Sequence, residues 1–426
     1  MKLMLLAALT LLVVTHPPSK TARDWNAEAV EAYQAKDYKT FLAAERRALE
    51  LEPSSPRYAY NVACGESLTG NTKEAVRLLI QLTDRKIDLG AQKDEDFASA
   101  RQTPEWREYT ARLQTLRQPI IRSVKAFEIP DSEIMAVGLA VDHATGDTYI
   151  SSIRQRKILR RDRAGAFSDF IQPAQDGFLG GGALAIDAPR DLIYASTAAV
   201  PFMRDYRKED SGKSGVYAFN LKTGKTERKA MLAPDGKQHF LNALAIDHKG
   251  NVYVSDSLNS GIYRLPRGKD DLETFIKPSV FEASQGLAFS DDEHTLYVAD
   301  FVDGMWALDM VSKNRHHLEP PLGSWLFGLD GIARVPDGFV CVQLQVQPNR
   351  VLHLKLDNKR EKIASVDVLE MNHPSYNEPI QGTLDGDSFL YVANSQIGLG
   401  NGETGAYEAE KARPTVVLRL PLTKTR

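Results

Sequence analysis

The sequence predicts a multidomain protein in which an all-α helical repeat precedes an all-β, six-bladed β-propeller. Residues 24–118 follow the helical period of about 3.6, whereas the chain after residue 120 alternates with a period of two. In this second part a short motif recurs six times, at steps of 45, 60, 43, 45 and 51 residues. Strand units at such spacing are typical of propeller blades.

Length and composition agree with two domains and exclude several classes of function. The 426 residues exceed what one compact core usually holds. The net charge of −3 gives no indication of a nucleic-acid partner or of an anionic membrane surface. The two cysteines, Cys64 and Cys341, fall in different predicted domains and form no CxxC or Cys/His spacing. We therefore expect both to be buried as small apolar residues, and no zinc site of that kind.

The amino-terminal residues have the pattern of a secretory signal peptide. A basic start is followed by the uncharged run Leu3 to Val14, which is too short to span a bilayer comfortably. We predict a signal peptide over residues 1–18 and export to the periplasm or the extracellular space. An uncleaved anchor is the alternative, because no clear cleavage site follows the run. No other segment indicates contact with a membrane.

Residues 24–118 contain two similar helix-turn-helix units. Lys36 to Lys39 and Gly70 to Lys73 occupy the same place in these units, 34 residues apart, and the first unit ends at Pro53. This period resembles the tetratricopeptide repeat. With a capping helix expected at about Ala91 to Leu116, the segment predicts a small solenoid that binds a protein or peptide partner. Such repeats can also merely dock onto the neighbouring domain, and a plain helical hairpin domain is the alternative to the repeat fold.

The propeller is predicted over residues 123–426. Each motif begins with an apolar strand, as in Asn242 to Asp247, and a hairpin then leads to a second strand, as in Asn251 to Asp256. The sixth copy has only three strands before the chain ends. The isolated strand 124–129, which precedes the first copy, can supply the fourth. That pairing would close the ring and remove its open edge.

Polar side chains are expected to converge at one mouth of the central channel, where the first strand of each blade begins. The residue before each Gly/Ala-Leu element points into this mouth, and the second strands end at the same face. The predicted ring is Val137, Gly182, Asn242, Gln285, Asp330 and Gln381, and the predicted second tier is Ser152, Thr197, Asp256, Asp300, Gln343 and Asn394. Converging carboxylate and amide oxygens are what a hard divalent cation such as Ca²⁺ prefers.

The propeller region resembles the regucalcin/gluconolactonase family of six-bladed propellers. The segment Phe240 to Leu244, with Asp256 to Leu258 after it, is similar to that family's asparagine-ligand blade, and Leu329 to Ile332 to its aspartate-ligand blade. The resemblance implies that Asn242 and Asp330 bind a divalent metal ion, with Ca²⁺ favoured over Zn²⁺ or Mn²⁺. It also implies that Asp330 is the general base of a metal-dependent lactonase or ester hydrolase.

Two departures from the family keep a second hypothesis open. Val137 stands where the family has a glutamate ligand, and Gly182 where an asparagine is expected; Glu133, Asn377 and Glu378 lie nearby in the sequence. The alternative is a propeller that binds a small ligand without turnover while its helical repeats recruit a partner. Long loops at 198–214 and 396–414 are expected over the same mouth. His239 could face it as a proton shuttle, or could be a loop residue.

Overall fold

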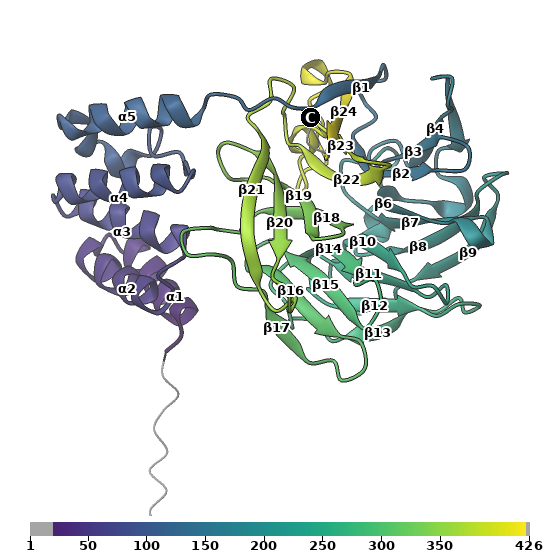
Figure 1. Ribbon diagram of the computed structural model, residues 1–426, viewed down its shortest axis with the longest axis horizontal. Helices are drawn as coiled ribbons and strands as arrows, with labels where there is room; N and C mark the ends of the chain where they lie inside the picture. Colours follow the sequence, from purple (N-terminus) through teal and green to yellow (C-terminus); the bar gives the residue numbers. More distant parts are fainter. Residues whose placement is uncertain (1–19, 423–426) are drawn as a thin grey trace, which may run out of the picture. The chain divides into compact units, whose positions relative to one another are not determined.

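The computed structural model describes residues 20–422, so the predicted signal peptide lies outside the described residues. The chain forms two compact units (Figure 1). One contains the first four helices with residues 90–112, and the other contains residues 85–89 and the chain from residue 113 onward. In the described part of the chain, no helix combines the length and the apolar character needed to cross a bilayer.

The helical unit is built from antiparallel helices with well-formed ends. Thr21 forms a capping box with Asp24, and Ser55 caps the helix that Pro56 begins. A Cβ atom on Gly65 would lie 2.9 Å from the Leu42 Cβ atom, so this glycine permits close helix packing. The helices are α1 (Ala22–Gln34), α2 (Tyr38–Leu51), α3 (Pro56–Leu68), α4 (Thr72–Asp84) and α5 (Glu105–Leu116).

The predicted capping helix is shorter than expected. The prediction placed its start at about Ala91, but the chain forms two 3₁₀ turns, Glu95–Phe97 and Ala100–Gln102, before α5 begins. Asp94 caps the first turn through the amide of Asp96, and Pro104 directly precedes α5. Such local side-chain bonds compete with a continuous helix, and proline favours a helix start.

The second unit is a propeller of six four-stranded antiparallel sheets, as predicted. The first strand of each blade lies nearest the centre of the ring (Figure 1). Each first strand contacts the first strand of the next blade, and β22 contacts β2, which closes the ring. Blade 1 holds β2 (Ala136–Asp142), β3 (Asp147–Ser152), β4 (Lys157–Arg161) and β5 (Phe167–Ile171). Blade 2 holds β6 (Gly180–Asp187), β7 (Leu192–Ala198), β8 (Ser214–Asn220) and β9 (Thr226–Met231).

The next blades repeat this order. Blade 3 holds β10 (Leu241–Ile246), β11 (Val252–Asp256), β12 (Ile262–Leu265) and β13 (Glu273–Ile276). Blade 4 holds β14 (Ser284–Phe289), β15 (Thr295–Asp300), β16 (Gly304–Asp309) and β17 (Arg315–His317). Blade 5 holds β18 (Leu329–Val335), β19 (Gly338–Gln343), β20 (Arg350–Leu356) and β21 (Ile363–Met371).

Blade 6 joins the two ends of the propeller chain. Its strands are β22 (Ile380–Asp385), β23 (Ser388–Val392), β24 (Thr415–Pro421) and β1 (Val124–Ile129). Strand β1 pairs antiparallel with β24, with Val124 opposite Arg419 and Ile129 opposite Thr415. The prediction that strand 124–129 completes the last blade is therefore confirmed. The pairing satisfies backbone groups that an open ring would expose.

An apolar cluster fills every interface between neighbouring blades. Between blades 1 and 2 it includes Tyr149 and Tyr217, and between blades 4 and 5 the rings of Tyr297 and Phe339 meet edge-on, 4.8 Å apart. Equivalent clusters occupy the other four interfaces. Cys64 and Cys341 are buried free thiols, as predicted. Packing on both faces of each sheet fixes the direction in which the first strands point.

Candidate functional site at the propeller mouth

Four of the six predicted ring residues meet in one polar cluster. The Asn242 side-chain amide donates to the Gln285 side-chain oxygen, and the Gln381 Nε2 atom lies 3.4 Å from the Asn242 Oδ1 atom. The Gln381 backbone amide donates to the Asp330 carboxylate at 3.0 Å. Asn242 and Asp330, 88 positions apart in the chain, therefore share Gln381 as a neighbour.

A register shift at the start of each first strand aims these side chains. The shifts lie between Leu241 and Leu244 in β10, between Asp330 and Ile332 in β18, and at the matching place in the other four blades. Bulges of this kind re-aim side chains and are frequent beside functional sites. Gly331 has φ of +67°, and a Cβ atom there would lie 2.4 Å from the Gln381 Cβ atom. Glycine at this position is what lets Gln381 approach Asp330.

Asp330 is the one carboxylate in the ring. Its side chain is 8% exposed and forms no ion pair among residues 20–422. Burial raises the pKa of its carboxyl group to about 6, although the hydrogen bond from the Gln381 amide acts in the opposite direction. A carboxyl group with this pKa is largely ionised at pH 7 and still basic enough to accept a proton.

The other two ring positions bring no polar side chain to the mouth. Val137 is 4% exposed and belongs to the apolar cluster that also contains Phe202 and the half-buried side chains of Phe240 and Ile397. A Cβ atom on Gly182 would lie 2.4 Å from the Ser196 Oγ atom, so this position has no room for a larger residue. Within residues 20–422, blades 1 and 2 thus add no side-chain oxygen to the ring at these positions.

The predicted second tier lies at the ends of the second strands, but its side chains form hydrogen bonds with main-chain groups. The Asp256 carboxylate accepts hydrogen bonds from the amides of Phe240, Leu258 and Asn259. Asp300 likewise binds four amides, two in the loop before β14 and two in the turn after β15. Ser152, Thr197 and Gln343 bond to the segment before their own first strand, and Asn394 bonds to Pro414 and Val416.

This tier therefore fixes the loops that carry the ring. Turn carboxylates that accept several N–H groups are already satisfied and have little capacity left for a metal ion. In the described residues, neither Asp256 nor Asp300 has a hydrogen bond to a ring residue. In blades 1 to 5 the strand-end residue anchors the segment that enters the first strand, and in blade 6 Asn394 anchors the segment that enters β24.

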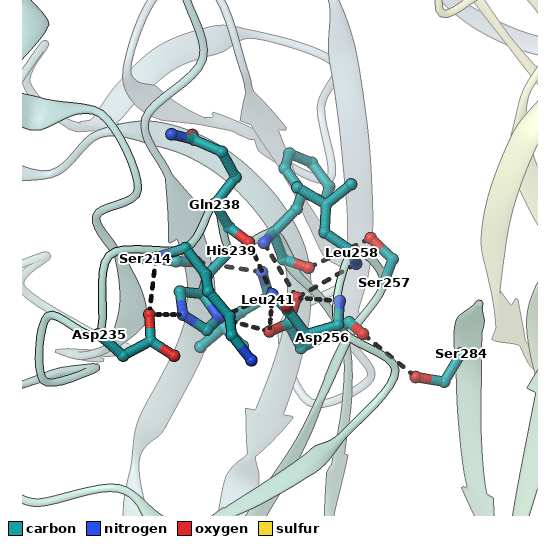
Figure 2. A network of polar contacts seen from close by, with 12 residues as sticks. Ser214, Asp235, Gln238, His239, Leu241, Asp256, Ser257, Leu258 and Ser284 are labelled. Atoms are coloured by element: carbon teal, nitrogen blue, oxygen red, sulfur yellow. Dashed lines mark hydrogen bonds and ion pairs between the residues drawn. The ribbon is translucent and has the colours of Figure 1, made fainter. Parts of the chain in front are cut away.

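His239 is buried between two carboxylates (Figure 2). Its Nδ1 atom lies 2.6 Å from the Asp256 Oδ2 atom, and its Nε2 atom lies 2.9 Å from the Asp235 Oδ1 atom. Burial lowers the pKa of the imidazole, but the hydrogen bonds to Asp256 and Asp235 outweigh it and leave the pKa raised. Both ring nitrogens are engaged, so His239 anchors a loop, and it has no hydrogen bond or ion pair with Asn242 or Asp330 among the described residues.

The two long loops lie against each other and contribute to the apolar cover of Val137. The Phe202 ring packs on Gly400, where a Cβ atom would lie 2.4 Å from the Phe202 Cγ atom. The Arg154 guanidinium donates to the Phe202 carbonyl at 2.8 Å and lies 3.7 Å from the centre of the Tyr407 ring. Glu133 pairs with Arg154 and Arg204, and Glu378 accepts from the Gly398 amide, so neither carboxylate replaces the missing ligand at Val137.

Below the polar ring, the central channel contains a cavity of about 430 Å³. All six first strands line it, from Gln381 near the ring to His143 and Arg334 near the opposite end. Its middle is a collar of mainly aliphatic side chains, formed by Leu139, Leu184, Leu244, Leu287, Ile332 and Thr383. The sequence does not predict this cavity, because its size depends on how closely the six strands approach one another.

The acidic and thiol side chains that gather most closely lie in the helical unit. Within the described range, ligand atoms of Cys64, Asp94 and Asp96 lie within 4.8 Å of one another. Tyr60 donates to Asp94 at 2.7 Å, and Tyr33 donates to Asp96 at 2.9 Å, so both carboxylates already have partners. The mouth, with one carboxylate and three amides, offers a different and less charged set of oxygen donors.

Comparisons with known proteins assign no family to this chain. No protein family and no curated protein matches the sequence. Among solved structures, a luciferin-regenerating enzyme is similar over 72% of this chain and 96% of its own, with 12% identity and a TM-score of 0.48. The calcium-binding protein regucalcin from Agrobacterium tumefaciens matches 70% of this chain and 93% of its own, with 14% identity and a TM-score of 0.46. A gluconolactonase from Xanthomonas campestris matches 72% and 94%, with 16% identity and a TM-score of 0.42.

Proposed function

We propose that the mouth of this propeller hydrolyses a lactone or a related ester, with Asp330 as the general base. The observation that carries the proposal is the buried Asp330 carboxyl group, whose pKa is raised to about 6 and which accepts a hydrogen bond from Gln381, a residue that also contacts Asn242. A base with this pKa can remove a proton from an attacking water molecule near neutral pH. The gluconolactonase resemblance of the segments around Asn242 and Asp330 points to the same chemistry.

The amides around Asp330 have a second role in this proposal. Attack on a lactone carbonyl places negative charge on the carbonyl oxygen, and N–H donors aimed at that oxygen lower the barrier. The Gln381 Nε2 atom makes only a long contact of 3.4 Å to Asn242, so it can turn toward a new acceptor. The Gln381 backbone amide meanwhile keeps the Asp330 carboxylate in place.

A divalent metal ion fits this site in part. The Asp330 carboxylate and the Asn242 side-chain oxygen are ligands of the type that Ca²⁺ takes, and both residues contact Gln381. Val137 and Gly182 add no oxygen, so water and substrate would complete the coordination. When bound, such an ion would polarise the carbonyl and lower the pKa of a bound water molecule.

Turnover of a lactone panel by the purified chain tests the proposal. The rate would be measured with Ca²⁺, Zn²⁺ or Mn²⁺ and with a chelator, for the wild type, for Asp330→Asn and for Asp291→Asn. Asp291 is a control because it forms ion pairs with Arg334 and Arg360, away from the polar ring. We expect Asp330→Asn to lower the rate by about 10²–10⁴-fold and Asp291→Asn to leave it unchanged. Equal rates in all three proteins would contradict the assignment of Asp330.

A ligand-binding propeller without turnover is the second candidate. It is favoured by Val137 and Gly182, and by the amides of Asn242, Gln285 and Gln381, which bond to one another. In this candidate the helical unit recruits a protein or peptide partner. A discrete partner that co-purifies with the full chain and is lost when residues 24–118 are deleted would support it. Saturable lactone hydrolysis would rule it out as the main function.

Export is part of the proposal. The basic start and the apolar run Leu3 to Val14 are the support for it. Amino-terminal sequencing of the protein from the periplasm or the medium of an expressing bacterium would test it. We expect a mature protein that lacks residues 1–18, whereas an intact chain that sediments with membranes would indicate the uncleaved anchor.

A further inference from the structure

Arg350 is a buried cation that has no anionic partner in the described part of the chain. Arg350 is the first residue of β20. It is 5% exposed, and its side chain forms no ion pair among residues 20–422. Its one hydrogen bond in the described structure runs from Nε to the Gln343 Oε1 atom, at 2.7 Å. Arginine is almost never buried to this extent unless it is paired, because an uncompensated charge loses its hydration. Burial lowers the pKa of this guanidinium to about 10, and no neighbouring charge counteracts it.

The strand pairing places this cation at the mouth face of blade 5. Gln343 lies opposite Leu329 on one side and opposite Arg350 on the other, and Leu329 precedes Asp330. Arg350 is therefore two strands outward from the strand of Asp330, which is roughly 10 Å at the usual strand spacing. The side chain is recessed and not sealed, because a small part of its surface stays exposed.

The surroundings of Arg350 are held in place by Gln343. The Gln343 Nε2 atom donates to the carbonyls of Trp325 and Phe327, at 3.0 and 2.7 Å, and its Oε1 atom accepts from Arg350. The rings of Trp325 and Phe327 are stacked 4.8 Å apart and are half-buried. The adjacent Asn349 Oδ1 atom is buried with no hydrogen-bond partner in the described structure. The fold thus holds a guanidinium whose two Nη groups have no acceptor among residues 20–422.

We propose that Arg350 is the anchor for a carboxylate-bearing ligand at the mouth face of the propeller. A single unmatched positive charge is neutralised by one monoanion, and a planar carboxylate matches the two free Nη groups. Phosphate near pH 7 is a mixture of monoanion and dianion, and the dianion would leave net negative charge in this buried site. The proposal adds a substrate class to the proposed hydrolase, namely lactones or esters of acids that carry a second carboxylate. It rests on that function only for calling the ligand a substrate.

Thermal unfolding of the full chain tests this proposal with acetate as the probe. The melting temperature would be measured in sodium acetate, in sodium phosphate and in sodium chloride of equal ionic strength, for the wild type and for Arg350→Met. Without acetate we expect Arg350→Met to unfold at a higher temperature than the wild type, because it removes an unpaired buried charge. With 100 mM acetate we expect the wild type to gain on the order of 2 °C relative to chloride, and the variant to gain nothing.

Arg190 provides the matched control. Its Nη1 atom pairs with both Asp187 carboxylate oxygens, at 2.9 and 3.0 Å. Arg190→Met should therefore lower the melting temperature and leave the acetate effect intact. A lower melting temperature or a failure to fold in Arg350→Met would assign Arg350 a structural role and overturn the proposal. Equal acetate effects in wild type and Arg350→Met, or a larger effect of phosphate, would also overturn it. None of these readouts uses turnover, so they are independent of the Asp330 experiment.

Discussion

The Gln381 backbone amide donates a 3.0 Å hydrogen bond to the Asp330 carboxylate from the neighbouring blade, 51 positions further along the chain. The contact depends on Gly331, whose missing side chain leaves space for Gln381. It also depends on closure of the ring, because blade 6 is complete only when β1 pairs with β24. The environment of the proposed base is therefore set by residues from distant parts of the chain.

The pH dependence of turnover should follow the Asp330 carboxyl group. The general base acts when it is ionised, and its pKa is raised to about 6. We expect the rate to increase as the pH rises through about 6 and then to level off. A pH profile of kcat/KM from pH 4.5 to 8.5 checks this. A profile that is flat over this range would show that Asp330 does not take up the proton.

Asp330→Asn should also make the fold more stable above pH 6. The folded-state pKa is higher than the ordinary value of 3.8, so ionisation at neutral pH opposes folding. We expect a gain of about 2 kcal/mol in the free energy of unfolding at pH 8, and almost none at pH 4. Urea unfolding at both pH values measures the difference, with Asp291→Asn as the exposed control. A loss of stability at pH 8 would show that the carboxylate holds the ring together.

Val137→Glu should convert the mouth into a stronger metal site. Val137 is buried among apolar side chains, so an unpaired glutamate there should cost about 3 kcal/mol of stability without metal. If its carboxylate meets Asp330 and Asn242 around one ion, millimolar Ca²⁺ or Mn²⁺ should restore part of this loss. Melting temperatures with metal and with chelator measure it. Val137→Gln is the control, and an equal response to metal in both variants would argue against a shared site.

Glu45→Gln should remove a pH dependence from the helical unit. Glu45 is fully buried in α2, its Oε1 atom accepts from Asn61 at 2.9 Å, and its Oε2 atom has no partner among the described residues. Burial raises the pKa of this carboxyl group to about 7. The folded state favours the protonated carboxyl group. Its stabilisation of the fold is therefore fully present below pH 4.5 and is lost as the pH rises through about 7.

The expected gain from Glu45→Gln is on the order of 2–3 kcal/mol at pH 8.5 and near zero at pH 4.5. Helical ellipticity at 222 nm during thermal unfolding is a suitable readout, because the described helices longer than one turn lie before the propeller. Glu50→Gln is the exposed control and should change little. A uniform change at both pH values would mean that Glu45 acts through packing alone.

The loop before β10 should loosen as the pH rises above the His239 pKa. Charged His239 bridges Asp256 and Asp235 and so stabilises the loop. Because the pKa of His239 is raised, this stabilisation is fully present below the ordinary pKa of 6.5 and is lost as the pH rises through the raised pKa. Hydrogen bonds to a charged group contribute about 1.5–3 kcal/mol. Hydrogen exchange of residues 235–241 at a series of pH values measures the opening. His239→Gln should remove the pH dependence, and an unchanged profile in this variant would assign it to another group.

Much of the propeller was predictable because blade architecture repeats locally. Six copies of one motif specify six first strands, and the surplus strand at 124–129 has its partner in a blade that lacks a fourth strand. The positions of Asn242, Gln285, Asp330 and Gln381 follow from that repetition, and the structure brings these four together. The start of α5 was predicted wrongly, because the 3₁₀ turns at 95–102 depend on the cap at Asp94 rather than on periodicity.

The sequence by itself determined the number of blades and the strand that closes the ring, because these follow from periodic patterns along the chain. Only the tertiary structure decided how the polar groups are used. Asp256 and Asp300 lie at the predicted strand ends, yet their oxygens are taken by backbone amides that come from loops. Arg350 looks like an ordinary strand residue in the sequence, and only the folded blade shows that it is buried with no anionic partner among residues 20–422. Hydrogen-bond satisfaction and burial depend on distant segments, and therefore no local pattern can predict them.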